Sequence, residues 1–261
     1  MKLIILGSGA ARPEFDRALP GQVVLVDDEP VMFDCGPGAG MNYVKAGISL
    51  AKLDSLFLTH LHIDHCVEYP AIVLGSYLYG RNGPFRVYGP KGTKVFSETV
   101  FEKLYPYAFA LVKNVSKTDL IIESKEVEPG LIYRAQKWNV SGCPVEHGFP
   151  TFAYKIESNG KSIIVSGDTA PCKPLIEFSH KATVLVMDCS FPDDMATVAK
   201  ATGHSTPGQV GQLAKEAEVE KVVLTHIFSF CRGREEEMLN SVRKTFSGEV
   251  MMGKDLLQLD V

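Results

Sequence analysis

The chain has 261 residues, a net charge of −4, 45% hydrophobic residues and 22% charged residues. This length suits one large domain or two small ones, and the composition is ordinary for a soluble globular protein. The acidic balance excludes a broad electrostatic attraction to nucleic acid or to an anionic membrane, although it leaves room for a local basic patch.

The amino terminus has only four consecutive apolar residues, Leu3–Leu6, before a glycine. Such a run is too short for a signal peptide and reads better as a first β-strand. No later apolar run approaches the length of a membrane span, so we expect a cytoplasmic protein with no membrane partner. The six cysteines lie far apart without a C-x-x-C pair, which favours reduced thiols over disulfides or a zinc finger.

Short apolar runs typical of β-strands recur along the chain, with helical patterns between several of them. The predicted strands are residues 3–6, 23–26, 31–33, 56–58, 152–156, 163–165, 184–187 and 222–224. Residues 206–218 and 234–246 are predicted helices, the first with Ser205 or Thr206 as N-cap and Pro207 in its first turn. This alternation favours an α/β layered fold.

Two ten-residue segments of the chain are similar to each other. Residues 51–60 (AKLDSLFLTH) align without gaps with residues 217–226 (AEVEKVVLTH). Each reads as a helix end, a turn, a buried strand and a Thr-His pair where the strand stops. We therefore expect a single domain, residues 1–261, made of two similar halves (about 1–125 and 126–261) with a site at their junction.

Four residues able to bind a metal ion fall within six positions: His60, His62, Asp64 and His65. By chance, an H-x-H-x-D-H string is expected in roughly 2 of 10,000 chains of this composition. A lone histidine would more simply be solvated or capping, but that explanation fits the string poorly. Histidines with a carboxylate suit Zn²⁺ best, and Mn²⁺ or Fe²⁺ are alternatives.

Two metal ions need more ligands, and three further residues stand at strand ends or in glycine-flanked loops: His147, Asp168 and His226. Each alone has a simpler explanation. Asp168 could be a turn or N-cap residue before a helix near Pro171, and the two histidines could be interior polar residues. Because the first cluster needs further ligands, we predict that all three bind metal.

The order H-x-H-x-D-H, His, Gly-Asp, Thr-His resembles the metallo-β-lactamase superfamily over nearly the whole chain. The segments LGSG (6–9), FDCG (33–36) and VYGP (87–90) also resemble strand ends of its ribonuclease Z branch. The resemblance implies a four-layer αββα sandwich (metallo-β-lactamase fold) with two divalent metal ions at the edge between its sheets.

Carried over residue by residue, the resemblance implies two ligand sets bridged by Asp168. One set is His60, His62 and His147, and the other is Asp64, His65 and His226. Asp34 would orient a ligand histidine, or else be an ordinary loop residue.

Gly203-His204-Ser205-Thr206 resembles the Gly-His-Ser-Thr segment of ribonuclease Z, which would place His204 beside the scissile group. Taken alone, this segment would be a capping loop with its imidazole facing water. In the implied mechanism a hydroxide that bridges the metal ions attacks the ester. Asp64 would orient this hydroxide, and His204 would stabilise charge or protonate the leaving oxygen. The remaining histidine, His180, is expected at the surface.

The spacing between His147 and Asp168 bears on the substrate. In tRNA-processing ribonuclease Z enzymes a long arm that grips the tRNA is inserted here, whereas this chain has only twenty residues between the two positions. They read as a hairpin with an Asn159-Gly160 turn. We therefore disfavour tRNA 3′ processing, and expect a phosphodiester of a small molecule or a nucleic-acid end. An arylsulfatase-like sulfate ester hydrolase is the alternative.

Other classes fit less well. A di-iron redox protein of this fold would normally carry glutamate in place of His62, and a catalytically silent binding protein would have lost ligands. The segment 7–12 lacks the third glycine of a dinucleotide-binding loop. The sequence shows no long nucleic-acid surface, and a homodimer follows from the resemblance alone.

Overall fold

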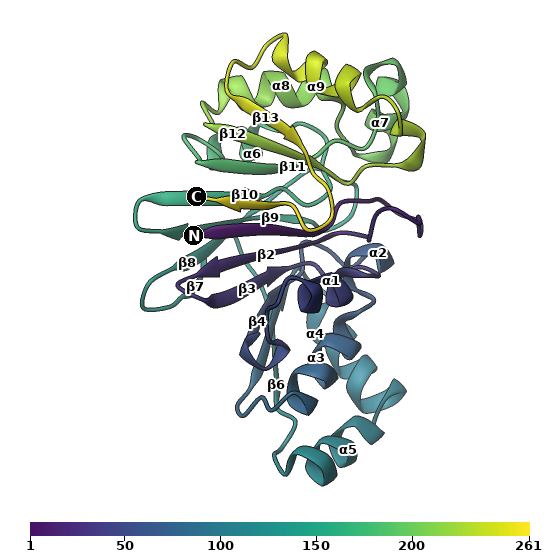
Figure 1. The fold of residues 1–261 in the computed structure, drawn as a ribbon, viewed down its shortest axis with the longest axis vertical. Helices are drawn as coiled ribbons and strands as arrows, with labels where there is room; N and C mark the ends of the chain where they lie inside the picture. The colour runs from purple at the N-terminus through teal and green to yellow at the C-terminus, as the bar shows by residue number, and fades with distance from the viewer.

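The computed structural model describes residues 1–261 and contains two seven-stranded sheets packed face to face. Helices α1 and α3–α5 cover the outer side of one sheet, and α6, α8 and α9 cover the outer side of the other (Figure 1). This arrangement confirms the predicted αββα sandwich. No helix has the length and apolar content that a bilayer crossing requires.

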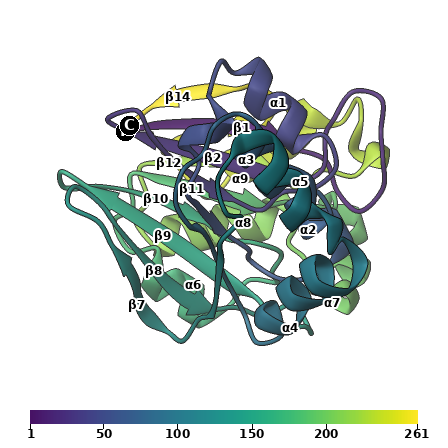
Figure 2. The same cartoon turned by 90° about the horizontal axis from the view of Figure 1, so that it is seen from below.

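The first sheet has the strand order β14-β1-β2-β3-β4-β5-β6. Its strands are β1 (Lys2–Gly7), β2 (Gly21–Val26), β3 (Glu29–Phe33), β4 (Ser55–Phe57), β5 (Phe85–Gly89), β6 (Ile122–Glu126) and β14 (Gln258–Asp260). Its α-helices are α1 (Ala39–Lys45), α2 (Ile63–Cys66), α3 (Tyr69–Leu78), α4 (Thr93–Glu98) and α5 (Tyr107–Ser116). Seen from the α5 side, these helices lie in front of the sheet (Figure 2).

The second sheet has the order β13-β12-β11-β10-β9-β8-β7. Its strands are β7 (Gly130–Arg134), β8 (Asn139–Pro144), β9 (Phe152–Ser158), β10 (Lys161–Val165), β11 (Val184–Asp188), β12 (Lys221–Thr225) and β13 (Glu249–Met252). Its α-helices are α6 (Lys173–Phe178), α7 (Ala196–Thr202), α8 (Pro207–Glu216) and α9 (Glu235–Arg243). All eight predicted strands and both predicted helices are present.

The eight predicted strands are largely buried on both faces, which explains their continuous apolar runs. In β1, Leu3 and Ile5 point between the two sheets, whereas Ile4 and Leu6 point towards the helices. Six strands were not predicted: β5, β6, β7, β8, β13 and β14. The edge strand β6 lacks an apolar run, since Ile122 is its only apolar residue.

Strands β9 and β10 form the predicted hairpin. Ser158 pairs with Lys161, and the turn residues Asn159 and Gly160 both have a positive φ, as a tight two-residue turn requires. The segment between His147 and Asp168 therefore carries no arm. All six cysteines are free, as predicted.

The two chain ends meet at the edge of the first sheet, where β14 pairs with β1. The first sheet thus takes one strand from the end of the chain, in addition to those from residues 2–126. The division into two similar halves near residue 125 stays a prediction.

Candidate metal centre

The seven predicted ligands come together where strands of both sheets end. His60 and His62 follow β4, and His62 is the N-cap of α2, which carries Asp64 and His65. The other three follow three parallel strands of the second sheet, β8, β10 and β12: His147, Asp168 and His226. The Thr-His pairs of the two similar segments therefore deliver their histidines, His60 and His226, to one place.

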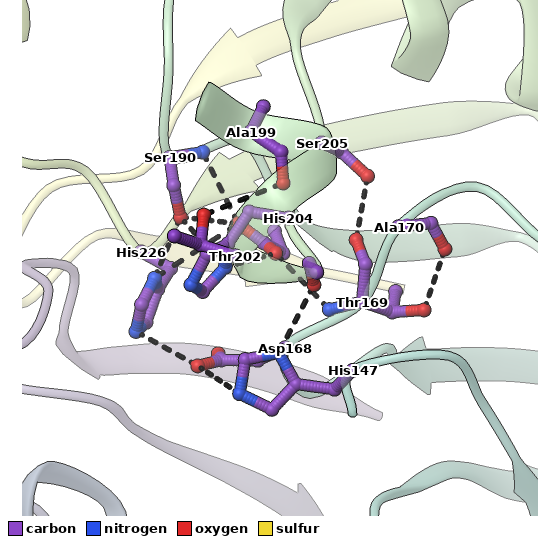
Figure 3. Close-up of polar contacts among 12 residues, drawn as sticks. His147, Asp168, Thr169, Ala170, Ser190, Ala199, Thr202, His204, Ser205 and His226 are labelled. Atoms are coloured by element: carbon purple, nitrogen blue, oxygen red, sulfur yellow. Dashed lines mark hydrogen bonds and ion pairs between the residues drawn. The ribbon is translucent and has the colours of Figure 1, made fainter. Parts of the chain in front are cut away.

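The carboxylate of Asp168 lies at the centre of this cluster and is 2% exposed. Its oxygens lie 3.2 Å from Nε2 of His65 and of His226, 3.6 Å from Nε2 of His147 and 3.7 Å from Nε2 of His60. In Figure 3, His147 and His226 point at Asp168 from different sides. Asp168 is not the N-cap of α6, since that position is occupied by Cys172.

Three imidazole nitrogens of the cluster are buried without a hydrogen-bond partner: Nε2 of His60, His65 and His226. A buried polar atom without a partner is costly, and bound metal ions would satisfy all three. The ligand atoms form two compact groups within 4.8 Å, one of His60, His62, His147 and Asp168 and one of Asp64, His65 and His226. Nitrogen and carboxylate donors in this arrangement suit divalent metal ions.

The histidines around Asp168 stabilise the ionised form of its carboxylate. Burial alone would raise the pKa of Asp168, but His226, His65 and His60 hold it well below its usual range. Burial and the neighbouring His65 hold the pKa of His60 well below its usual range, so this imidazole is neutral, as a metal ligand must be. Burial opposes the charged form of His65 too, but Asp168 and Asp34 outweigh it and raise its pKa.

Asp34 holds Thr59 and His65 in place through hydrogen bonds. Its carboxylate accepts hydrogen bonds from the backbone N–H of Thr59 at 2.7 Å and from the Thr59 hydroxyl at 2.8 Å. It also lies 2.8 Å from Nδ1 of His65, which turns Nε2 of that ring towards Asp168. The prediction that Asp34 orients a histidine of the cluster agrees with this contact. Asp34 and His226 both have a positive φ, near 55° and 58°, a strained conformation typical of functional sites.

His204 is buried beside the cluster, 4.9 Å from His147 between ring centroids. Its Nδ1 lies 2.8 Å from the carboxylate of Asp188. Burial alone would lower the pKa of His204, but Asp188 outweighs it and raises this pKa to about 9. Asp168, His204 and His226 also form a compact group of ligand atoms.

Asp188 and Ser190, which the sequence analysis did not single out, link His204 to the predicted ligand His226. The Ser190 hydroxyl donates to Asp188 at 2.5 Å. It also lies 2.7 Å from Nδ1 of His226 (Figure 3). Asp188 ends β11, between the strands that deliver Asp168 and His226. Its place at the end of the predicted strand 184–187 was the available signal.

Aromatic side chains form an apolar shell around the cluster. Phe149 lies 5.0 Å from the His62 ring, and Phe191 and Phe228 lie 5.8 and 6.0 Å from the rings of His204 and His226. Such a shell controls the access of water to a metal site. His180, the remaining histidine, is exposed as predicted.

The fold and the cluster agree with the comparison with known protein families. Residues 30–227 match the family model described as Beta-lactamase superfamily domain. This chain belongs to the metallo-β-lactamase superfamily. Together with the cluster of histidine and carboxylate ligands, this membership makes the protein a metal-dependent hydrolase.

A curated relative, ribonuclease Z of Methanosarcina mazei, is 30% identical over an alignment that covers 100% of this chain and 98% of the relative. The alignment spans 310 positions, so the relative carries segments that this 261-residue chain lacks.

Two solved structures have the same fold. The metallo-β-lactamase fold protein YhfI of Bacillus subtilis has a TM-score of 0.83 and 21% identity, with 99% of this chain and 98% of YhfI covered. The short form of human tRNase Z has a TM-score of 0.81 and 23% identity, with 100% and 99% covered.

Proposed function

We propose that this hydrolase cleaves phosphodiesters, using two divalent metal ions held by the seven clustered side chains. The proposed ligand sets are those predicted from the sequence: His60, His62 and His147 for one ion, Asp64, His65 and His226 for the other, and Asp168 for both. The observation that carries the proposal is the buried Asp168 carboxylate, which faces three imidazole nitrogens without partners. Zn²⁺ suits this donor set best, and Mn²⁺ or Fe²⁺ are alternatives.

When bound, two such ions supply Lewis-acid polarisation of the phosphoryl group and a nucleophilic water at neutral pH. The chain's own residues position the reactants. One carboxylate oxygen of Asp64 accepts the backbone N–H of Ala11 at 3.0 Å, which fixes this side chain for orienting the attacking water. Asp188 holds Nδ1 of His204, and Nε2 of His204 is then free to give a proton to the leaving oxygen.

The relatives favour phosphodiesters over sulfate esters. The curated relatives that cover nearly the whole chain are named ribonucleases, and RNA is a phosphodiester. They also make tRNA 3′ processing the second candidate. The tight β9–β10 hairpin argues against it, because it leaves no arm to grip a tRNA body. A small substrate or a nucleic-acid end is therefore our first choice.

Hydrolysis of three model substrates tests this function. We expect the metal-loaded protein to hydrolyse bis(p-nitrophenyl) phosphate, to hydrolyse p-nitrophenyl sulfate far more slowly, and to leave a tRNA precursor uncut. Chelation should abolish the activity, and added Zn²⁺ should restore it. Turnover of the sulfate but not of the phosphodiester would contradict the proposal. Efficient cutting of the tRNA precursor would contradict our first choice of substrate and favour tRNA 3′ processing.

A further inference from the structure

Two loops of the second sheet carry a phenylalanine two residues after a predicted ligand histidine. Phe149 follows His147 in the loop between β8 and β9, and Phe228 follows His226 after β12. Figure 3 shows these two histidines on different sides of Asp168. The two loops thus bring an aromatic side chain to the metal centre from two directions.

Phe149 lies at the most open part of the centre. Its ring is 5.0 Å from the ring of His62, the only predicted ligand that is not buried, and Phe149 itself is 44% exposed. The Thr151 hydroxyl donates to the Phe149 carbonyl at 2.9 Å, and the N–H of Phe152 donates to the carbonyl of Thr59 at 2.9 Å. These bonds tie the loop to the strand end that precedes His62, so a partly uncovered ring stands in a defined place beside the centre.

Phe228 belongs to a second aromatic surface, which consists of Phe191, Phe228 and Phe230. The Phe228 ring lies 6.0 Å from His226. It stacks on Phe230 almost in parallel, with 5.1 Å between centroids and 10° between planes. Phe191 is buried against both rings, at 5.3 and 5.4 Å, whereas Phe230 is 41% exposed. This surface therefore extends from His226 to solvent.

The position of these rings indicates which part of a substrate they contact. Single exposed apolar side chains are common on proteins, but here both aromatic surfaces touch histidines of the metal centre. A phosphodiester bound at this centre has one substituent on each side of its phosphorus. Phenyl rings favour stacking on planar groups, and nucleobases stack on aromatic side chains whatever their identity. A cavity of about 660 Å³ beside His147 and His204, lined also by one face of α8, leaves further room for a bound substrate.

We propose that Phe149 and the surface of Phe191, Phe228 and Phe230 stack on two planar groups, one on each side of the scissile phosphate. The inference rests on the proposed phosphodiesterase activity and names its substrate class, a diester that joins two nucleosides. Because stacking tolerates every base, the identity of the two bases should matter little.

Abasic analogues of the dinucleotide TpT test the inference. In one analogue an abasic tetrahydrofuran unit replaces the nucleoside on the 5′ side, and in the other it replaces the nucleoside on the 3′ side. The reacting phosphodiester is the same in all three substrates, so a difference in rate reports the missing base. For the wild-type protein we expect kcat/KM to be about 5- to 20-fold lower on each analogue than on TpT, the effect of losing one base–aromatic stack.

Phe149→Leu and Phe230→Leu remove a planar ring but keep an apolar side chain. Each should shrink one of the two ratios by at least about threefold and leave the other at its wild-type value. Phe149→Tyr keeps a planar ring and should retain both ratios. Phe109→Leu is the matched control, because Phe109 is 40% exposed but lies on α5, on the outer side of the first sheet (Figure 1). Both of its ratios should equal those of the wild type.

A ratio of two substrates measured on one preparation does not depend on the fraction of folded enzyme. Equal kcat/KM on TpT and on both analogues would overturn the inference, while hydrolysis of TpT would uphold the proposed function. Wild-type ratios in both Phe149→Leu and Phe230→Leu would also overturn it, because the bases would then bind elsewhere. Failure to hydrolyse any phosphodiester would overturn the proposed function, and the inference with it.

Discussion

Asp168→Ala is expected to lower kcat/KM on a phosphodiester by at least about 10³-fold, which corresponds to about 4 kcal/mol of transition-state stabilisation. The oxygens of this carboxylate lie within 3.7 Å of histidine nitrogens of both ligand sets. Its removal takes a ligand from both proposed ions and leaves the surrounding imidazoles without their counter-charge. Metal content and steady-state kinetics measured on the same preparation check this result.

Two controls separate the loss of a ligand from a loss of folding. Asp168→Asn keeps the shape of the side chain and should also lose activity, because an amide is a poor replacement for a bridging carboxylate. Asp54→Ala removes a surface carboxylate that pairs with Arg86 and should retain full activity. If Asp168→Ala bound two equivalents of metal and kept wild-type turnover, the proposed centre would be wrong.

His204→Ala is expected to lower kcat by about 10²- to 10⁴-fold for a substrate with a poor leaving group, with metal content unchanged. The loss should be much smaller for p-nitrophenyl esters, since p-nitrophenolate departs without a proton. Rates for a series of aryl and alkyl phosphodiesters, plotted against the pKa of the leaving alcohol, measure the difference. The plot should be steeper for the variant than for the wild type.

Asp188→Asn should impair the same step as His204→Ala, but to a smaller extent. Asp188 touches His204 and Ser190 but no proposed metal ligand at hydrogen-bond distance, so we treat it as a positioning residue. Its loss should lower kcat by about 10- to 100-fold, as for partners that orient catalytic groups, and steepen the same plot less than His204→Ala does. An equal loss for good and poor leaving groups in His204→Ala would contradict the role of His204 as the acid.

Local patterns made much of the fold and of the cluster predictable. Strands such as β1 and β11 are buried on both faces and therefore show as apolar runs, and the H-x-H-x-D-H string is compact enough to be improbable by chance. The edge strand β6 escaped prediction because Ile122 is its only apolar residue.

The residues that were missed act through tertiary contacts. Asp188 and Ser190 reach His204 and His226 only because β11 lies between β10 and β12. The only local signal was the place of Asp188 at the end of a predicted strand. The polar face of α8 is similar: Gln209 and Glu216 look like an ordinary solvent-facing pattern. Only the packing of α7 and the His147 loop beside that face creates a cavity.

The central claim is that two metal ions share the Asp168 carboxylate, and titration of the metal-free protein with Zn²⁺ tests it most directly. Calorimetry should give two ions bound per chain, and phosphodiesterase activity followed in the same titration should appear as the second ion binds. Binding of a single ion per chain, or hydrolysis by the protein kept metal-free with chelator, would contradict the account.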